Sequence, residues 1–280
     1  MNEYVTYAAL KTYLRISEAD SDALLRGFAT QASRVFDQAT RRRFYPRIET
    51  RSYDHPINAN VLVVDDDLLT VETFTTGNGG VTLAAADYFL MCGREYNLTP
   101  YDRIVMRMDG DHTSLEYLET PQQANTVAGV WGYHEDWAQA WDAVDVLAGD
   151  VNDAVVSLAV VDADGADLDG STPRFAAQQL IQVGTEYMAV TGVTAETTNT
   201  LAVRRGVNGT SAAAHASGDA VSVYRPMVDV VHAVRRLAAW MYGQKDQPYA
   251  ERIQAAQQGI IMIPEGMPAD VQRVIRRYAR

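Results

Sequence analysis

Two different hydrophobic spacings divide this chain, and they restrict the folds that it can adopt. Between Asp20 and Ala39, apolar residues recur every three or four positions, which is the spacing of a helix with one buried face. The same spacing returns from Pro226 to Gly243 and again after Pro268. The long middle of the chain has instead short runs rich in Val, Thr, Tyr and Phe, separated by turn residues. The sequence therefore predicts an α+β protein.

The strand-rich middle falls into two parts of different composition. Residues 47–133 predict an antiparallel sheet or long hairpins that close on the sequence GVWGY. Residues 142–225 are rich in Ala, Val, Thr and Asp, and predict a small all-β domain inserted into the host fold. We therefore expect a helical core with antiparallel β-hairpins or a sheet, contributed by residues 1–141 and 226–280, plus the insert. The last part is expected to hold several helices, including a short one from Pro248.

The charge of the chain is unevenly distributed. The 280 residues have a formal net charge of −12, and fourteen acidic residues but no Lys or Arg lie between Met108 and Pro173. Arginines gather instead where two predicted helices end, in the stretches 41–43 and 273–280. Binding to nucleic acid of any sequence needs clustered cations, so the bulk of this chain is not expected to bind DNA. The arginine clusters are candidates for contacts with other protein surfaces, beside simpler roles at helix ends or in solvent.

Motifs that carry catalytic or metal chemistry are absent from the sequence. It has no G-x-S-x-G, no phosphate-binding loop of the form G-x-x-x-x-G-K-[ST] and no H-E-x-x-H, and its five histidines are scattered. The acidic segment VVDADGADLDG does not place oxygen ligands and glycine in the register of an EF-hand loop. The single cysteine, Cys92, excludes an internal disulfide. We expect no enzyme activity, no metal, no cofactor and no membrane span.

Four segments, taken in their order, resemble the head–tail connector (adaptor) proteins of tailed bacteriophages. The opening YAALKTYLRISEADSDALLRGFATQASRVFDQATRRRFYP has the family's short helix, Leu-Leu helix and basic-aromatic exit. GVWGY is similar to the family's Gly-x-Phe/Trp-Gly element, PMVDVVHAVRRLAAWMY to its Pro-initiated helix, and MPADVQRVIRRYAR to its Arg-rich closing helix. The resemblance covers about residues 1–141 and 226–280.

The insert resembles a different kind of protein, a small β module that recurs in phage virion proteins. It carries the pattern Arg-Gly-x-x-Gly-Thr-x-Ala-x-x-His-x-x-Gly from Arg205 to Gly218. Glycines at these positions permit tight turns that bulkier residues resist. His215 is expected to order a loop rather than to catalyse a reaction.

The connector resemblance implies a structural virion protein. Such a protein would form a homo-oligomeric ring, dodecameric in the family, beneath the portal protein at the neck. The ring would extend the DNA channel, let DNA pass without specific binding, and dock the next neck or tail protein. Because the first residues, MNEYVTYAALKTYL, lack the pattern of a signal peptide, synthesis in the host cytoplasm is expected, with no membrane contact.

Ten residues form the expected partner-binding set: Arg41, Arg42, Arg43, Phe44, Tyr45, Arg273, Arg276, Arg277, Tyr278 and Arg280. The first five are expected to form an ion-paired seam with a neighbouring subunit or the portal, with the two aromatic residues packed beside the arginines. Helix-end and solvent contacts, or contact with DNA, are the alternatives for the arginine trio. The last helix is expected to dock on the portal. Its removal before Pro268 is expected to stop head–tail joining while the rest of the chain still folds.

Other functions stay open at this point. The chain is alternatively a tail-completion or baseplate protein whose inserted module binds a partner or a host-surface glycan. A cell-wall hydrolase with an unfamiliar carboxylate pair is less favoured, because no motif supports it. The module can also bind carbohydrate within a connector, and a glycan screen on the isolated insert would separate that role from a spacer.

Overall fold

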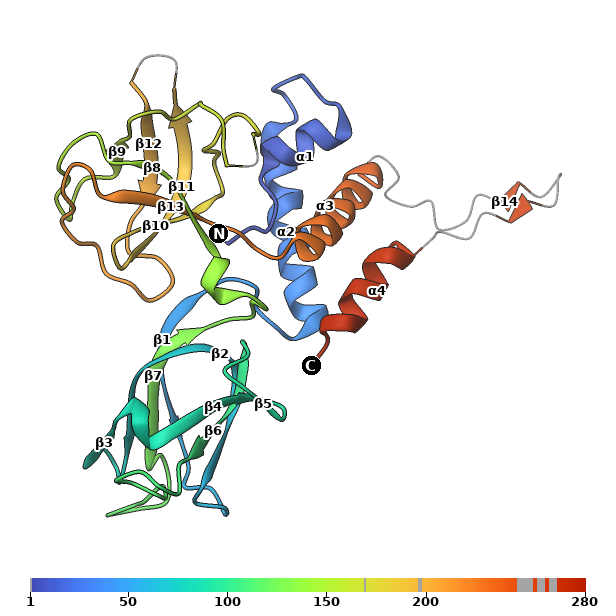
Figure 1. Ribbon diagram of the computed structural model, residues 1–280. Coiled ribbons are helices and arrows are strands. Elements are labelled where there is room, and N and C mark those ends of the chain that lie inside the picture. Colours follow the sequence, from blue (N-terminus) through green and yellow to red (C-terminus); the bar gives the residue numbers. More distant parts are fainter. Residues whose placement is uncertain (1, 169, 196–197, 246–253, 256–259, 262–265) are drawn as a thin grey trace.

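The computed structural model shows two large β-sheets and a layer of α-helices (Figure 1). It describes residues 2–168, 170–195, 198–245, 254–255, 260–261 and 266–280. The helices are α1 (Tyr7–Leu14), α2 (Asp22–Thr40), α3 (Val228–Gly243) and α4 (Ala269–Tyr278). The short helix expected from Pro248 lies largely outside the described residues. Within that stretch, β14 (Gln254–Ala255) and β15 (Ile260–Ile261) pair as a two-stranded sheet.

The first sheet has the strand order β1-β7-β2-β6-β4-β5, with β3 paired to β2 and every pairing antiparallel. A short 3-10 helix, η1 (Ala85–Asp87), precedes β4. The strands are β1 (Arg47–Tyr53), β2 (Val61–Thr76), β3 (Val81–Leu83), β4 (Tyr88–Cys92), β5 (Glu95–Tyr96), β6 (Tyr101–Met106) and β7 (Asn125–Trp131).

The longest strand of this sheet, β2, changes partner along its length. Its first part pairs with β6 and its second part with β7, and the pairing with β6 shifts register between Val63 and Leu68. Three consecutive aspartates, Asp65 to Asp67, occupy this irregular stretch. A break in the ladder therefore accommodates acidic residues in the middle of an otherwise apolar strand.

The second sheet has the strand order β8-β13-β10-β11-β12-β9 and is antiparallel throughout. Its own core includes Leu158 and Phe175, both fully buried. Because β8 and β13 are neighbours, the chain arrives and leaves side by side, and the Arg225 N–H donates to the Ala140 carbonyl at 2.8 Å. Its strands are β8 (Trp141–Val146), β9 (Ser157–Ala159), β10 (Leu180–Val183), β11 (Glu186–Thr194), β12 (Thr200–Arg204) and β13 (Ala220–Tyr224), with η2 (Trp137–Gln139) before them.

The helices do not form a core of their own, so the prediction of a helical connector core is wrong. Their buried faces pack partly on one another and partly on the second sheet, where Leu180, Tyr187 and Tyr224 belong to the same hydrophobic cluster as the helical residues. Each sheet has a further core to itself. Helical spacing indicates that one face of a helix is buried, but it does not show which element packs on that face. Here strands of the second sheet pack on much of it. The chain is mostly β, and α+β describes it only loosely.

The loop after β12 fastens the second sheet to the rest of the chain. The carbonyl of Asn208 accepts from the Ile48 N–H of β1 at 2.8 Å. The side-chain amides of Asn208 and Asn2 exchange two hydrogen bonds, of 2.8 and 2.9 Å. Gly209 has φ +87°, and a Cβ there would lie 2.0 Å from the Ile48 carbonyl oxygen. Only glycine fits this contact.

A buried carboxylate orders the same loop. Glu186 accepts from the Arg205 guanidinium through both oxygens at 2.7 Å and lies 2.9 Å from the His215 ring. The N–H groups of Gly206 and Ala213 also donate to it, each at 3.0 Å. Burial alone would raise the pKa of Glu186, but the Arg205 and His215 hydrogen bonds lower it to about 2. His215 therefore contacts a carboxylate that holds the loop, which is a loop-ordering position.

The Gly209 contact gives a test of this joint. Gly218→Ala places a side chain at φ +89° with no atom within 4 Å, so only backbone strain of about 1–2 kcal/mol is expected. Gly209→Ala has the same strain and also a clash with Ile48, which adds about 1–3 kcal/mol. Urea unfolding should show the larger loss of stability for Gly209→Ala. Equal losses for the two variants would mean that the loop does not press on β1.

Candidate assembly surface

Three of the segments that resemble connector proteins meet at one place in the fold. The exit of α2 lies against the end of β7, because the Tyr133 N–H donates to the Arg43 carbonyl at 2.7 Å. The carboxyl end of α4 joins them, since the Arg280 N–H donates to the Thr40 carbonyl at 3.0 Å. Residues far apart in the sequence, including both predicted arginine clusters, are thus brought together.

Arg42 ties these segments to one another. Its Nε donates to the Tyr278 carbonyl at 2.7 Å, its Nη1 pairs with Asp67 of β2, and its guanidinium lies 4.6 Å from the centre of the Tyr133 ring. Asp67 is buried, and its Oδ2 finds no hydrogen-bond partner in the described part of the chain. Burial raises the pKa of Asp67 against the opposing effect of Arg42. The Arg42 guanidinium is therefore paired with a carboxylate of the same chain.

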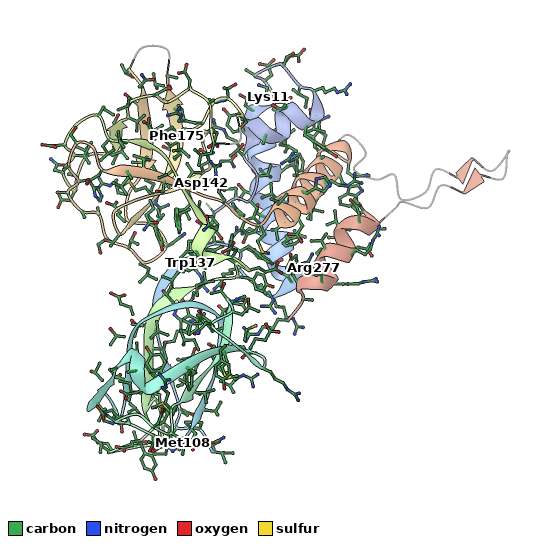
Figure 2. The ribbon with its side chains drawn as sticks, viewed as in Figure 1. Lys11, Met108, Trp137, Asp142, Phe175 and Arg277 are labelled. Atoms are coloured by element: carbon green, nitrogen blue, oxygen red, sulfur yellow. The ribbon has the colours of Figure 1, made fainter. Side chains whose placement is uncertain are left out.

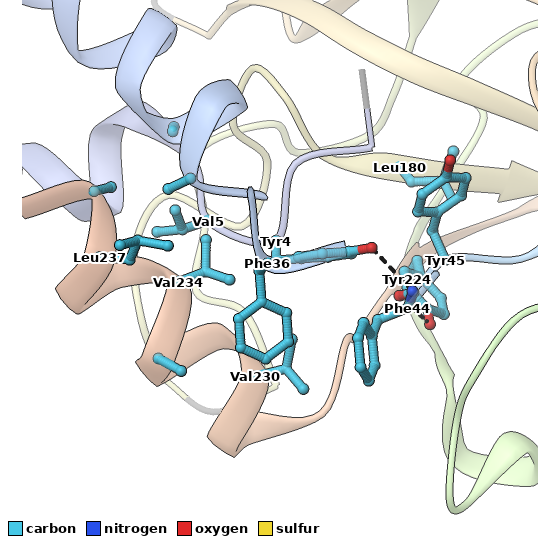
Figure 3. Close-up of a cluster of buried hydrophobic side chains, with 14 of the residues drawn as sticks. Tyr4, Val5, Phe36, Phe44, Tyr45, Leu180, Tyr224, Val230, Val234 and Leu237 are labelled. Carbon is cyan, nitrogen blue, oxygen red and sulfur yellow. Dashed lines mark hydrogen bonds between the residues drawn. The ribbon is translucent and has the colours of Figure 1, made fainter. Parts of the chain in front are cut away.

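Phe44 lies in the hydrophobic core next to this cluster (Figure 3). Its ring meets Tyr278 edge-on, with 5.5 Å between ring centres. Its N–H donates to the Tyr4 hydroxyl and its carbonyl accepts from the Tyr224 hydroxyl, both at 2.9 Å. Tyr45 is buried in the same cluster. Both aromatic side chains are thus buried within this chain, and a seam formed by them with a partner stays a prediction.

The last helix, α4, is fixed by its buried face and exposes arginines on the other. Val271 and Tyr278 are buried, and the Tyr278 hydroxyl donates to Asp229 of α3 at 2.5 Å. Arg273 and Arg276 are exposed, and neither forms an ion pair with any residue that the structure describes. Buried residues and arginines thus occupy opposite faces of one short helix.

The other two arginines at this end are partly engaged within the chain. Arg277 is exposed and lies 3.3 Å from Asp229 and 3.6 Å from Glu135. Exposed pairs of this kind contribute roughly 0–1 kcal/mol, so Arg277 can exchange them for a partner. Arg280 is held mainly by hydrogen bonds: its side chain donates to the Val64 carbonyl at 3.2 Å, and its N–H donates to the Thr40 carbonyl of α2.

The backbone at the end of α2 separates the three consecutive arginines. Arg41 has φ +56°, a left-handed conformation that ends the helix and turns the chain. Arg41 and Arg43 are exposed as a result, and Arg42 points inward between them. We call Arg273, Arg276 and Arg277 the arginine face of α4. Together with Arg41 and Arg43, it forms the accessible part of the predicted set, apart from Arg280, which is exposed but bonded to α2 through its backbone.

Three residues that hold this cluster from the other side were not predicted from the sequence. Arg42 pairs with Asp67 and lies over the ring of Tyr133, and the Tyr278 hydroxyl donates to Asp229. None of these three partners was among the ten predicted residues. One signal was present: three aspartates interrupt the apolar strand sequence NVLVVDDDLL, and a buried acid in such a strand requires a cationic partner. Which arginine supplies it was not visible in the sequence.

A second buried acid lies on α2. Asp37 accepts from the Tyr4 hydroxyl at 2.5 Å and pairs with Arg34 at 2.9 Å. Burial raises the pKa of Asp37 to about 6, although the contacts with Tyr4 and Arg34 oppose this shift. The N-terminal segment is thus joined to α2 through a carboxyl that titrates in a mildly acidic range.

Neither a metal centre nor a membrane-spanning element is found in the described part of the chain. No three His, Cys, Asp or Glu side chains there are arranged to hold a metal ion. None of its helices has the length and apolar character needed to cross a membrane.

The arginine trio allows a test with controls on both sides. Arg42→Ala should lower the free energy of unfolding by about 3–5 kcal/mol, because it leaves the Asp67 carboxylate buried without its partner. Arg41→Ala and Arg43→Ala remove the same side chain from exposed positions and should cost less than about 0.5 kcal/mol. Urea unfolding at pH 7 measures all three. Similar losses in the three variants would contradict the role of Arg42.

The raised pKa of Asp37 makes a prediction about pH. The folded state holds this proton more tightly than the unfolded state, so stability from this group is complete below about pH 4 and is lost as pH rises through 6. Asp37→Asn removes that dependence. The stability of the wild type relative to Asp37→Asn should fall by about 2–3 kcal/mol between pH 4 and 7. Glu72→Gln, at an exposed position, is the control. A constant difference between wild type and Asp37→Asn would refute the shift.

Comparisons with known proteins give little further information. No protein-family model matches the chain, and no curated protein matches it. Among solved structures, a chain of the "Neck of empty GTA particle computed with C6 symmetry" aligns with 99% of this chain and 89% of its own length, at 14% identity and a TM-score of 0.41. That protein belongs to the neck of a phage-like particle. A likeness of this size carries no argument about this chain.

Proposed function

We propose that this chain is a structural protein of the neck of a tailed-phage-like particle. In this role it is an adaptor that forms a ring beneath the portal protein and receives the next neck or tail protein. The support comes from the order of the connector-like segments in the sequence and from their meeting in the fold around Arg42 and Phe44. The weak structural neighbour agrees with a neck role, but the proposal does not rest on it.

The observation that carries the proposal is the arginine face of α4. In a chain with net charge −12, Arg273 and Arg276 project from a helix that Tyr278 and Arg42 hold in place. Cations presented on a fixed helix suit an acidic surface on a partner protein, because little side-chain and backbone order is lost on binding. We assign this surface to the portal protein.

The charge distribution also suits a ring of identical subunits around DNA. Contacts between copies in a ring join two different surfaces of the same chain, and basic and acidic surfaces of one chain are complementary. The acid-only stretch between Met108 and Pro173 would let DNA pass without adsorption, since like charges repel. The connector resemblance implies a ring of twelve copies.

Deleting α4 is not the clean test that the sequence suggested. Removal of the chain from Pro268 would take Val271 and Tyr278 out of the core and leave the Tyr278 partners uncovered. The shortened protein is therefore expected to lose stability as well as partner binding. Charge reversal on the exposed face leaves the core intact and separates the two effects.

The double variant Arg273→Glu/Arg276→Glu should fold normally and fail to bind the portal. Purified protein is mixed with the portal protein of the same genome and imaged by electron microscopy, where the wild type should add a second ring to the portal. Arg15→Glu/Arg26→Glu makes the same charge change at exposed positions near α1 and the start of α2, and should bind as the wild type does. Rings formed equally well by both variants would exclude the arginine face.

Wild-type protein that folds but leaves portals bare would favour the alternative function. The chain would then be a tail-completion or baseplate protein, and the second sheet would become the part to test for binding to a partner or a glycan.

A further inference from the structure

Loops from distant parts of the sequence gather at the end of the first sheet that lies away from the helices (Figures 1 and 2). The loop between β1 and β2 is bonded to the loop between β6 and β7: the His55 N–H donates to the Pro121 carbonyl at 2.7 Å, and the Asn60 side chain donates to the Thr113 carbonyl at 2.7 Å. Met108, in the second loop, marks this end in Figure 2.

Four large apolar side chains are exposed on these loops. Ile57, Met108, Tyr117 and Leu118 have relative exposures of 110%, 74%, 52% and 67%. We call these four residues the sheet tip. Isolated exposed apolar residues are common, but several on loops that are bonded together are typical of a binding surface.

The loops of the sheet tip are held in a fixed conformation by side chains beneath them. The Asn78 amide oxygen accepts from the N–H groups of Leu118 and Glu119 at 3.0 and 3.1 Å, and its NH2 group donates to the Thr120 carbonyl at 3.0 Å. The Gly77 N–H donates to the Glu116 carbonyl at 3.0 Å. Leu118 is therefore presented on an ordered backbone, and ordering it on binding costs little.

Every charge on the long loop beyond Met108 is negative. Exposed carboxylates flank the apolar residues, and one of them, Asp109, lies 3.6 Å from Arg107 at the start of the same loop. The flanking acids are Asp54, Asp109, Asp111, Glu116 and Glu119. Such a surface repels DNA and anionic lipid. It complements a protein surface in which apolar side chains are bordered by Lys or Arg.

We infer that the sheet tip docks on a second partner protein, one with an apolar surface bordered by Lys or Arg. This partner differs from the one that binds the arginine face, because a surface complementary to either would be repelled by the other. The two surfaces are also well separated, as the positions of Met108 and Arg277 show (Figure 2). The inference rests on the proposed function and deepens it: with α4 on the portal, the sheet tip receives the next neck or tail protein.

The test uses particles assembled in cells with variants of the full chain. Two variants change the sheet tip: Met108→Ser/Leu118→Ser removes apolar surface, and Asp109→Lys/Glu119→Lys reverses charge. Two matched controls act at exposed positions elsewhere: Val161→Ser/Leu168→Ser in the second-sheet region, and Glu72→Lys/Asp153→Lys. Electron microscopy counts heads that carry a neck ring and heads that carry a tail.

Both sheet-tip variants should give heads with rings but about tenfold fewer tails, whereas both controls should match the wild type. Normal tailing of the sheet-tip variants would overturn the inference. Heads without rings would also overturn it, because the sheet tip would then contact the portal or a second copy of the chain. Failure of the proposed function gives a different result, since antibody against the wild-type protein would then not label the necks of wild-type particles.

Discussion

A charge that is largely removed from solvent is stable only when its neighbours satisfy it, and Arg42, which is half-buried, meets this condition through three separate elements. It pairs with Asp67 of β2, donates to the last residue of α4 and lies against the ring of Tyr133 after β7. The first sheet and the helix layer each have hydrophobic contacts of their own, but this cluster fixes how the two are placed relative to each other. The position of the arginine face depends on it, because α4 is short and a helix of about ten residues is marginal by itself.

Three hydrophobic clusters stabilise different parts of the fold. One lies inside each sheet, and the third joins the helices to the second sheet. Because each cluster is formed largely by its own residues, the helix layer and the first sheet can expose different surfaces without a change in any of the three clusters. The arginine face lies on α4, whereas the exposed apolar and acidic residues of the sheet tip and its loops lie on the first sheet. These two surfaces of opposite charge are thus separated in space as well as along the chain.

The positions of the helices were predictable because apolar spacing is a local property. The helical spacing that begins at Pro226 stops at Gly243 in the sequence, and α3 ends at that residue. The helical core was not predictable, because Leu180 and Tyr224 cover helical residues from strands far away in the sequence. For the candidate site, the spacing after Pro268 predicted a buried face on the last helix, and in the structure the arginines of α4 lie opposite that face. The sequence did not show that Arg42 points inward while Arg41 and Arg43 are exposed. This arrangement depends on the left-handed backbone of Arg41 and on the acidic partner Asp67 in β2. The division into residues 1–141, 142–225 and 226–280 stays a prediction.

The pairing of β8 with β13 has a mechanical consequence. The chain passes into the second sheet and out of it through two adjacent antiparallel strands, closed at their base by the Arg225–Ala140 hydrogen bond and the Arg225–Asp142 ion pair. Tension applied along the backbone between η2 and α3 therefore acts first on this junction, where the chain enters and leaves the second sheet.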